Sequence, residues 1–132
     1  MKKIDIICIV EDDPTQLFIT KKYLELSGLV ETIMVYRNGK EAYEKLKAIF
    51  MASEKLPEII LLDLNMPIWD GWHFLEEFTK IPIEYKVHIY ILTSSDRQED
   101  KEQAARYNLN SNYLIKPISL SEIKTILSEI EP

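Results

Sequence analysis

Apolar residues gather in five short runs along the chain, and polar stretches separate these runs. The runs are rich in Ile, Val and Leu and cover residues 4–10, 32–36, 59–62, 87–92 and 113–115. Unbroken apolar runs of this length are typical of strands that are buried on both faces of a sheet. The clearest of them is Ile59–Leu62, four consecutive large aliphatic residues that lead directly into Asp63.

Between these runs, apolar residues recur at helical spacing. Residues 15–27 are predicted to form a first helix with Gly28 as its C-cap, although its apolar residues spread too widely to define one face. Asn38-Gly39 is predicted to form a turn, and Asp70 is expected to cap the third helix. Three helices are predicted to turn an apolar face inward. In the second helix this face is Ala42, Leu46, Ile49 and Phe50, and in the third it is Gly71, Phe74, Leu75 and Phe78. In the fifth helix it is Leu120, Ile123, Leu127 and Ile130.

The alternation of five strands with five helices predicts an α/β fold, a doubly wound five-stranded parallel sheet with helices on both faces. The fourth helix, residues 97–107, has few apolar residues and is expected to be the least firmly docked. Ser119 and Glu122 have the spacing of a capping box for the fifth helix. With 132 residues and no linker or repeat, the chain is expected to be a single domain over residues 1–132 without an output domain.

Composition narrows the possible functions. Apolar residues make up 46% and charged residues 29% of the chain, which is ordinary for a globular domain. A net charge of -6 argues against a nucleic-acid or membrane surface as partner, because such surfaces attract Lys and Arg. The single Cys8 excludes a disulfide framework, and Asp5 interrupts the apolar run after Met1 too early for a signal peptide. The protein is therefore expected to be cytoplasmic.

Reactive side chains follow four of the five predicted strands. The first strand leads to Glu11 and Asp12, the third to Asp63, the fourth to Thr93 and the fifth to Lys116. In a parallel sheet of this kind, ligands bind beyond the carboxyl ends of the strands. Each residue alone has an ordinary structural explanation as a cap, turn or surface group, but their arrival at one edge of the sheet favours a functional site.

The charges of this group indicate a metal ion. Glu11, Asp12 and Asp63 carry three negative charges and Lys116 returns one positive charge, so the carboxylates are expected to raise one another's pKa unless a cation binds. Oxygen ligands suit Mg²⁺, with Mn²⁺ as a substitute, and no Cys or His lies at this edge to favour a softer metal. A carboxylate beside Mg²⁺, faced by an amine and a hydroxyl, suits phosphoryl transfer to the carboxylate itself, with Asp63 as nucleophile.

Four segments carry a family resemblance. They are Val10-Glu11-Asp12, the stretch 63–71 (Asp-Leu-Asn-Met-Pro-Ile-Trp-Asp-Gly), Leu92-Thr93-Ser94, and the stretch 113–117 (Tyr-Leu-Ile-Lys-Pro). Together, in this order and spacing, they resemble the signature of the response-regulator receiver domain of two-component signalling. The resemblance covers essentially the whole chain and implies the flavodoxin-like (βα)5 fold with strand order 2-1-3-4-5.

The resemblance also implies roles for individual residues. Asp63 would accept a phosphoryl group from the phosphohistidine of a sensor histidine kinase or histidine phosphotransfer protein. Mg²⁺ would be bound by Asp12 and Asp63, by Glu11 through water and by the backbone carbonyl of Asn65. Lys116 would pair with the phosphoryl group, and Thr93 and Tyr113 would form a switch pair. Ser94, Ser95 and Pro117 would be secondary residues of the site, and the bond from Lys116 to Pro117 can be cis.

Some alternatives remain open at this point. A register shifted by one residue would give the metal roles to Asp12 and Asp13 instead of Glu11 and Asp12. A phosphatase of the haloacid-dehalogenase type would need a second acid at position 65, where the chain has Asn. A flavin or nucleotide module would need a phosphate-binding loop after the first strand, where an acidic run stands.

Signalling is expected to pass through a downstream protein target. The fourth helix, fifth strand and fifth helix are the expected output face, with Arg106, Tyr113 and Lys124 as candidate residues. The chain is expected to act as a monomer or as a homodimer linked to phosphorylation, and its activity is expected to be limited to its own phosphorylation and dephosphorylation.

Overall fold

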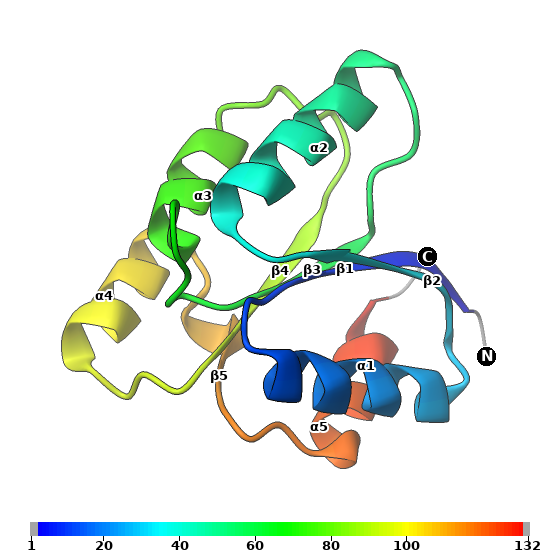
Figure 1. Cartoon of the computed structure of the whole chain (residues 1–132), viewed down its shortest axis with the longest axis vertical. Helices are drawn as coiled ribbons and strands as arrows, with labels where there is room; N and C mark the ends of the chain where they lie inside the picture. The colour runs from blue at the N-terminus through cyan, green and yellow to red at the C-terminus, as the bar shows by residue number, and fades with distance from the viewer. Residues whose placement is uncertain (1–2, 131–132) are drawn as a thin grey trace.

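Five parallel strands form one sheet in the computed structural model, which describes residues 3–130 (Figure 1). The strands are β1 (Ile4–Val10), β2 (Val30–Tyr36), β3 (Ile59–Leu62), β4 (His88–Thr93) and β5 (Tyr113–Ile115). Their order across the sheet is β2-β1-β3-β4-β5, and every neighbouring pair is parallel. The predicted fold class and strand order are confirmed.

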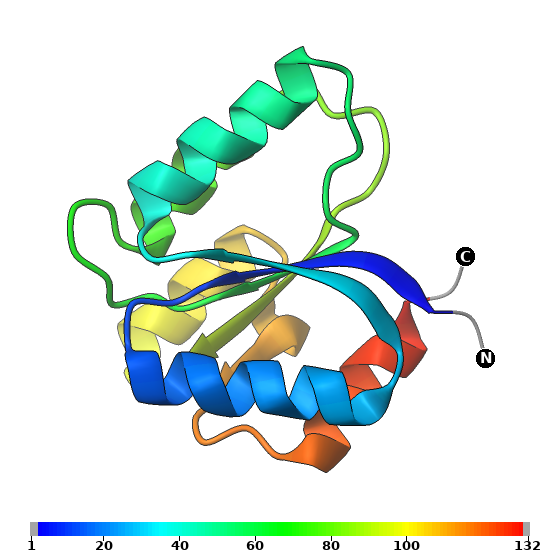
Figure 2. The same ribbon diagram turned by 45° about the vertical axis from the view of Figure 1, so that its right-hand side comes forward.

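Helices cover both faces of the sheet. They are α1 (Pro14–Ser27), α2 (Gly39–Met51), α3 (Gly71–Phe78), α4 (Gln98–Arg106) and α5 (Leu120–Glu129), with a 3-10 turn η1 at Asn110–Asn112. Figures 1 and 2 show α1 and α5 on one face, and α2, α3 and α4 on the other. The sheet therefore has an apolar core on each side, and its central strands are shielded from water by both layers.

The strands are buried because side chains on both of their faces meet helices. All four residues of β3 are buried, and alternate residues enter opposite cores: Ile59 and Leu61 pack towards α1 and α5, and Ile60 and Leu62 towards α2 and α3. Their burial removes apolar surface from water, worth about 1.5–3 kcal/mol for each large side chain. A continuous apolar run is what this two-sided burial requires.

Local signals begin and end the helices. The side chains of Asp13, Asn38, Asp70 and Ser119 accept hydrogen bonds from backbone N–H groups in the first turns of α1, α2, α3 and α5. Ser119 and Glu122 form the predicted capping box. Gly28 ends α1 in the left-handed conformation at φ 69°, which a glycine adopts without the clash that a Cβ atom brings.

Several predicted details differ from the structure. The strand predicted at 32–36 begins at Val30, and the one predicted at 87–92 covers His88–Thr93. Asn38 caps α2 rather than forming a free turn. In α5 the buried residues are Ile123, Ile126 and Leu127. Leu120 instead lines a surface hollow on the outer side of α5, which the helical spacing alone did not reveal.

The fourth helix buries only Asp100 and Ala104, as its polar pattern indicated, and the first helix, whose face the pattern left undefined, also buries few residues. In α1 only Thr20 and Leu24 are buried, and Phe18 and Leu26 face solvent.

Among residues 3–130, no helix is long and apolar enough to cross a membrane.

Candidate functional site

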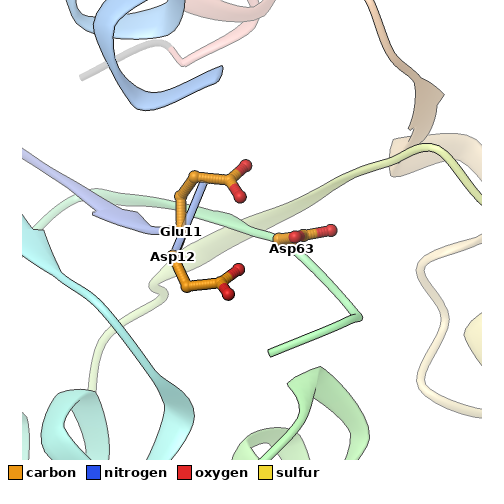
Figure 3. Close-up of side chains that lie close together, drawn as sticks. All are labelled: Glu11, Asp12 and Asp63. Atoms are coloured by element: carbon orange, nitrogen blue, oxygen red, sulfur yellow. The ribbon is translucent and has the colours of Figure 1, made fainter. Parts of the chain in front are cut away.

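Three carboxylates meet where β1 and β3 end. Figure 3 shows Glu11 and Asp12, which follow β1, beside Asp63, which follows β3. Each residue offers a carboxylate oxygen, and these oxygens all lie within 4.8 Å of one another. The strand register explains this meeting, because Val10 pairs with Leu62 and both strands therefore end at the same level. Three like charges at this separation repel one another unless a cation is near.

Asp63 is held by the end of β1 and by its own loop. Its backbone N–H donates to the carbonyl of Val10 at 3.0 Å, and its Oδ1 accepts from the N–H of Leu64 at 2.8 Å. The residue is 6% exposed, so its carboxylate is fixed and largely shielded from water. A carboxylate that is fixed in this way loses little conformational freedom when it reacts.

Lys116 supplies the positive charge of the site. Its Nζ lies 2.5 Å from Oε1 of Glu11 and 3.4 Å from Oδ2 of Asp63. Its backbone N–H donates to the carbonyl of Thr93, which continues the β4–β5 ladder and sets the position of the side chain. The bond from Lys116 to Pro117 is cis.

Glu11 is the acidic group most affected by its surroundings. Burial is the main cause that raises the pKa of Glu11, to about 7, and the charge of Asp63 adds to this rise. The hydrogen bond and the charge of Lys116 act in the opposite direction. Repulsion between carboxylates, the cause that the sequence suggested, is therefore secondary to desolvation.

The predicted switch residues are connected through Ser95. Thr93 is fully buried, and its Oγ1 accepts from the backbone N–H of Ser95 at 3.2 Å. The hydroxyl of Tyr113 donates to the backbone carbonyl of the same Ser95 at 2.9 Å. The side chains of Thr93 and Tyr113 are thus connected through the backbone of Ser95, which lies in the loop that follows β4.

A hollow of about 400 Å³ opens over Asp63. Its lining residues are Asp12, Asp13, Gln16, Asp63, Asn65, Ser94, Lys116 and Pro117. Of the predicted secondary residues, Ser94 and Pro117 line the hollow. The side chain of Ser95 points towards α4 instead, where it donates to Asp100. Such an opening makes the carboxylate of Asp63 accessible to a small group from outside.

Two neighbours of the site were missed at the level of sequence. Gln16 lies in the first turn of α1 and lines the hollow. Its place directly after the acidic loop is the sequence signal that could have identified it as a neighbour of the site. Arg37 follows β2, and its Nη2 donates to the backbone carbonyl of Asp12 at 2.7 Å. The end of β2 is therefore the fifth strand end beside the site.

The structure bears on the alternative register of the acidic run. Asp13 is the N-cap of α1, and its Oδ1 accepts from the backbone N–H groups of Thr15 at 2.8 Å and Gln16 at 3.3 Å. Its carboxylate is thus used in helix capping, whereas Glu11 and Asp12 share the cluster with Asp63. The geometry favours Glu11 and Asp12 over Asp12 and Asp13.

The donor set fits a hard divalent cation. It consists of carboxylate oxygens, which suit Mg²⁺ and Mn²⁺, and its charge is only partly balanced by Lys116.

Added Mg²⁺ is expected to raise the thermal unfolding midpoint. When the free Mg²⁺ concentration is about ten times its Kd, binding adds about 1.4 kcal/mol to the free energy of unfolding. For a domain of this size, that corresponds to a rise of roughly 5 °C in the midpoint. Asp12→Asn is expected to abolish most of this rise, and Asp13→Asn, which keeps a capping oxygen, is expected to retain it. A thermal melt with and without Mg²⁺ measures the effect, and an equal loss in both variants would contradict the assignment.

Comparison with known proteins identifies the family. Residues 7–128 match the response regulator receiver domain. The chain is 31% identical over 126 residues to the probable methanogenesis regulatory protein FilR2 of Methanothrix harundinacea, which covers 96% of this chain and 81% of that protein. A two-component response regulator from Cytophaga hutchinsonii superposes with a TM-score of 0.85 at 26% identity, covering 97% of each chain.

The chain belongs to the response regulator receiver domain family of two-component signalling systems. Members of this family are signalling phosphoacceptors rather than classical enzymes, and histidine kinases phosphorylate them. A solved structure of response regulator Rcp1 in a Mn²⁺-bound form is also similar, with a TM-score of 0.73 and 26% identity over 96% of this chain and 91% of that one. The family membership predicted from the sequence is confirmed.

Proposed function

We propose that this protein is a single-domain response regulator that accepts a phosphoryl group on Asp63. The donor is the phosphohistidine of a sensor histidine kinase or a histidine phosphotransfer protein, and the reaction depends on Mg²⁺. The protein acts in the cytoplasm through a downstream protein target, as a monomer or as a homodimer linked to phosphorylation. Its own activity is limited to gaining and losing the phosphoryl group.

One observation carries this proposal: the Asp63 carboxylate lies at the base of an open hollow with Lys116 at 3.4 Å. Phosphoryl transfer to a carboxylate needs a positioned nucleophile and compensation of the charge on the phosphoryl oxygens. Asp63 and Lys116 supply these two requirements from the ends of β3 and β5.

The reaction can be followed through the residues of the chain. A carboxylate oxygen of Asp63 forms a bond to phosphorus, and the bond from phosphorus to the donor's histidine nitrogen breaks, with its electron pair leaving on nitrogen. Lys116 compensates the charge of one phosphoryl oxygen. Mg²⁺, held by Asp12, Asp63, the Asn65 carbonyl and, through water, Glu11, would supply further positive charge to the phosphoryl group.

Thr93 is placed to respond to the new group. Its Oγ1 accepts a hydrogen bond from Ser95, so its own hydroxyl hydrogen remains free to be donated to a phosphoryl oxygen. Movement of this hydroxyl would alter the loop after β4 and, through Ser95, the ring of Tyr113. We therefore propose the α4-β5-α5 face as the output surface, with Arg106, Tyr113 and Lys124 among its residues.

Intact-protein mass spectrometry tests the proposal. Incubation with phosphoramidate and Mg²⁺ is expected to add the mass of one phosphoryl group, because this small donor replaces the kinase. Asp63→Asn is expected to gain no such mass, and omission of Mg²⁺ is expected to slow the gain strongly in the wild-type protein. Phosphorylation of the Asp63→Asn variant at the wild-type rate would contradict the assignment of Asp63.

A further inference from the structure

Ser95 occupies a central position in the loop between β4 and α4. Its N–H donates to Oγ1 of Thr93, and its carbonyl accepts from the hydroxyl of Tyr113. Its side-chain hydroxyl donates to Oδ2 of Asp100 at 2.5 Å. Three groups of one residue thus connect both switch residues to a carboxylate on α4.

Asp100 is an unusual residue for its position. It lies in the first turn of α4, the most polar helix of the fold, and is nevertheless only 8% exposed. Its Oδ1 accepts from the indole Nε1 of Trp72 at 2.9 Å, and Nε of Arg97 lies 3.5 Å from its Oδ2. Burial acts to raise the pKa of Asp100, but the hydrogen bonds from Ser95 and Trp72 and the charge of Arg97 outweigh it, so the pKa lies below its usual value.

Trp72 connects this carboxylate to α3. Its ring packs near the small core under α4, with Leu64, Ile91 and Ala104, and stacks on Tyr107 with a centroid distance of 6.1 Å. Figure 1 shows α4 beside α3 at this edge of the molecule. Since Asp100 and Ala104 are the buried residues of α4, the bond from Trp72 to Asp100 is a main attachment of the helix to α3.

We infer that Asp100 is a positioning residue that links the state of the phosphorylation site to the docking of α4. It fixes the hydroxyl of Ser95, and the backbone of Ser95 in turn fixes the hydroxyls of Thr93 and Tyr113. On its other side it holds Trp72. The path Thr93–Ser95–Asp100–Trp72 therefore runs from β4 through α4 to α3 by direct hydrogen bonds.

This inference rests on the proposed function. When the Thr93 hydroxyl turns to a phosphoryl oxygen, the acceptor of the Ser95 N–H moves, and the loop around Ser95 shifts. Asp100 follows Ser95 because it accepts the Ser95 hydroxyl, and the hydrogen bond to the Trp72 indole changes with it. The local surroundings of Trp72 then report the state of Asp63, and a variant without the Asp100 link does not transmit the change.

The fluorescence of Trp72 tests the link. The sequence has two tryptophans, so Trp69→Phe leaves Trp72 as the single emitter. Beryllium fluoride with Mg²⁺, a phosphoryl mimic, is expected to shift the Trp72 emission of this protein. The shift is expected to be lost when Asp100→Ala or Ser95→Ala is added, because the first removes the acceptor of both Ser95 and Trp72 and the second removes the hydroxyl that donates to Asp100.

Asp96→Ala is the matched control. Asp96 lies in the same loop and carries the same charge, but it is exposed and pairs with Lys101 at 2.5 Å instead of with Trp72 or Ser95. This control is expected to keep the full emission shift. Circular dichroism checks that each variant is folded, and Ser95→Ala provides the test if Asp100→Ala does not fold.

The mass gained from phosphoramidate separates the two possible failures. A phosphorylated Trp69→Phe protein whose Trp72 emission does not respond would overturn the link and leave the proposed function standing. An unchanged shift in both Asp100→Ala and Ser95→Ala would also overturn it. If the Trp69→Phe protein gains no phosphoryl mass, the proposed function itself fails.

Discussion

Replacement of Lys116 by methionine is expected to lower the free energy of unfolding by about 3 kcal/mol in Mg²⁺-free buffer. Lys116 is a partner of both Glu11 and Asp63, and the side chains of all three residues are largely buried. Methionine has a similar volume and no charge, so the substitution leaves the carboxylates without a counter-charge. The expected loss lies at the low end for a buried ion pair, because the raised pKa of Glu11 allows it to take up a proton.

The same variant has a second expected property. Mg²⁺ can replace the lost positive charge, so it is expected to restore more stability to Lys116→Met than it adds to the wild-type protein. In the wild-type protein, burial raises the folded-state pKa of Glu11 above its unfolded value, so the folded protein binds the proton more tightly and its stability is expected to fall as the pH rises through about 7. Loss of Lys116 removes two causes that lower this pKa, so the fall in stability is expected at a higher pH in the variant. Urea unfolding with and without Mg²⁺, at a pH below and a pH above 7, measures both effects.

Lys101→Met is the control for this prediction. Lys101 pairs with Asp96 at 2.5 Å, but both side chains are substantially exposed, so the loss of stability is expected to be much smaller than for Lys116→Met. Equal losses in the two lysine variants would show that Lys116 does not balance a buried acidic cluster.

Gly71→Ala is expected to destabilise the protein by about 2–3 kcal/mol and to disturb the site as well. A Cβ atom at Gly71 would lie 2.6 Å from the carbonyl oxygen of Asp63 and 3.0 Å from Cα of Leu64. Both contacts are with backbone, so α3 must move away from the end of β3. The loop with Asn65 would move too, and the rise in melting midpoint with Mg²⁺ is expected to shrink.

Gly28→Ala is the control that separates the steric clash at Gly71 from the cost of placing a Cβ atom on a left-handed backbone. No atom lies within 4 Å of a Cβ atom at Gly28, so only its left-handed conformation opposes the substitution, at about 1 kcal/mol. Urea unfolding of the two variants is expected to show the larger loss for Gly71→Ala, and the response to Mg²⁺ is expected to change only there. Similar losses with an intact Mg²⁺ response in both would contradict the close packing of α3 on β3.

The fold could be predicted where one local rule decided each element. The run Ile59–Leu62 has a single simple explanation, a strand buried on both faces, and the structure gives those bounds. The capping box at Ser119 likewise predicted the start of α5. The face of α1 could not be predicted, because the helix buries a threonine, Thr20, and leaves Phe18 69% exposed.

The candidate site could be predicted as a set of residues but not as a set of contacts. Topology alone brings Glu11 and Lys116 together across 105 positions of sequence, and only the structure gives their 2.5 Å separation. Asp100 was not found, since an aspartate in a polar helix gives no local sign of burial. Its partners Trp72 and Ser95 come from α3 and the loop before α4, and their meeting depends on how α4 packs.

The burial of Cys8 in the middle of β1 has a practical consequence. It is the single cysteine of the sequence, it is fully buried, and burial raises the pKa of its thiol, which keeps it protonated. The native surface therefore offers no reactive thiol to a maleimide dye or a spin label. A cysteine introduced on α4, with a second on α1, can be labelled without first removing Cys8, and the distance between the two labels can then be followed as the protein is phosphorylated.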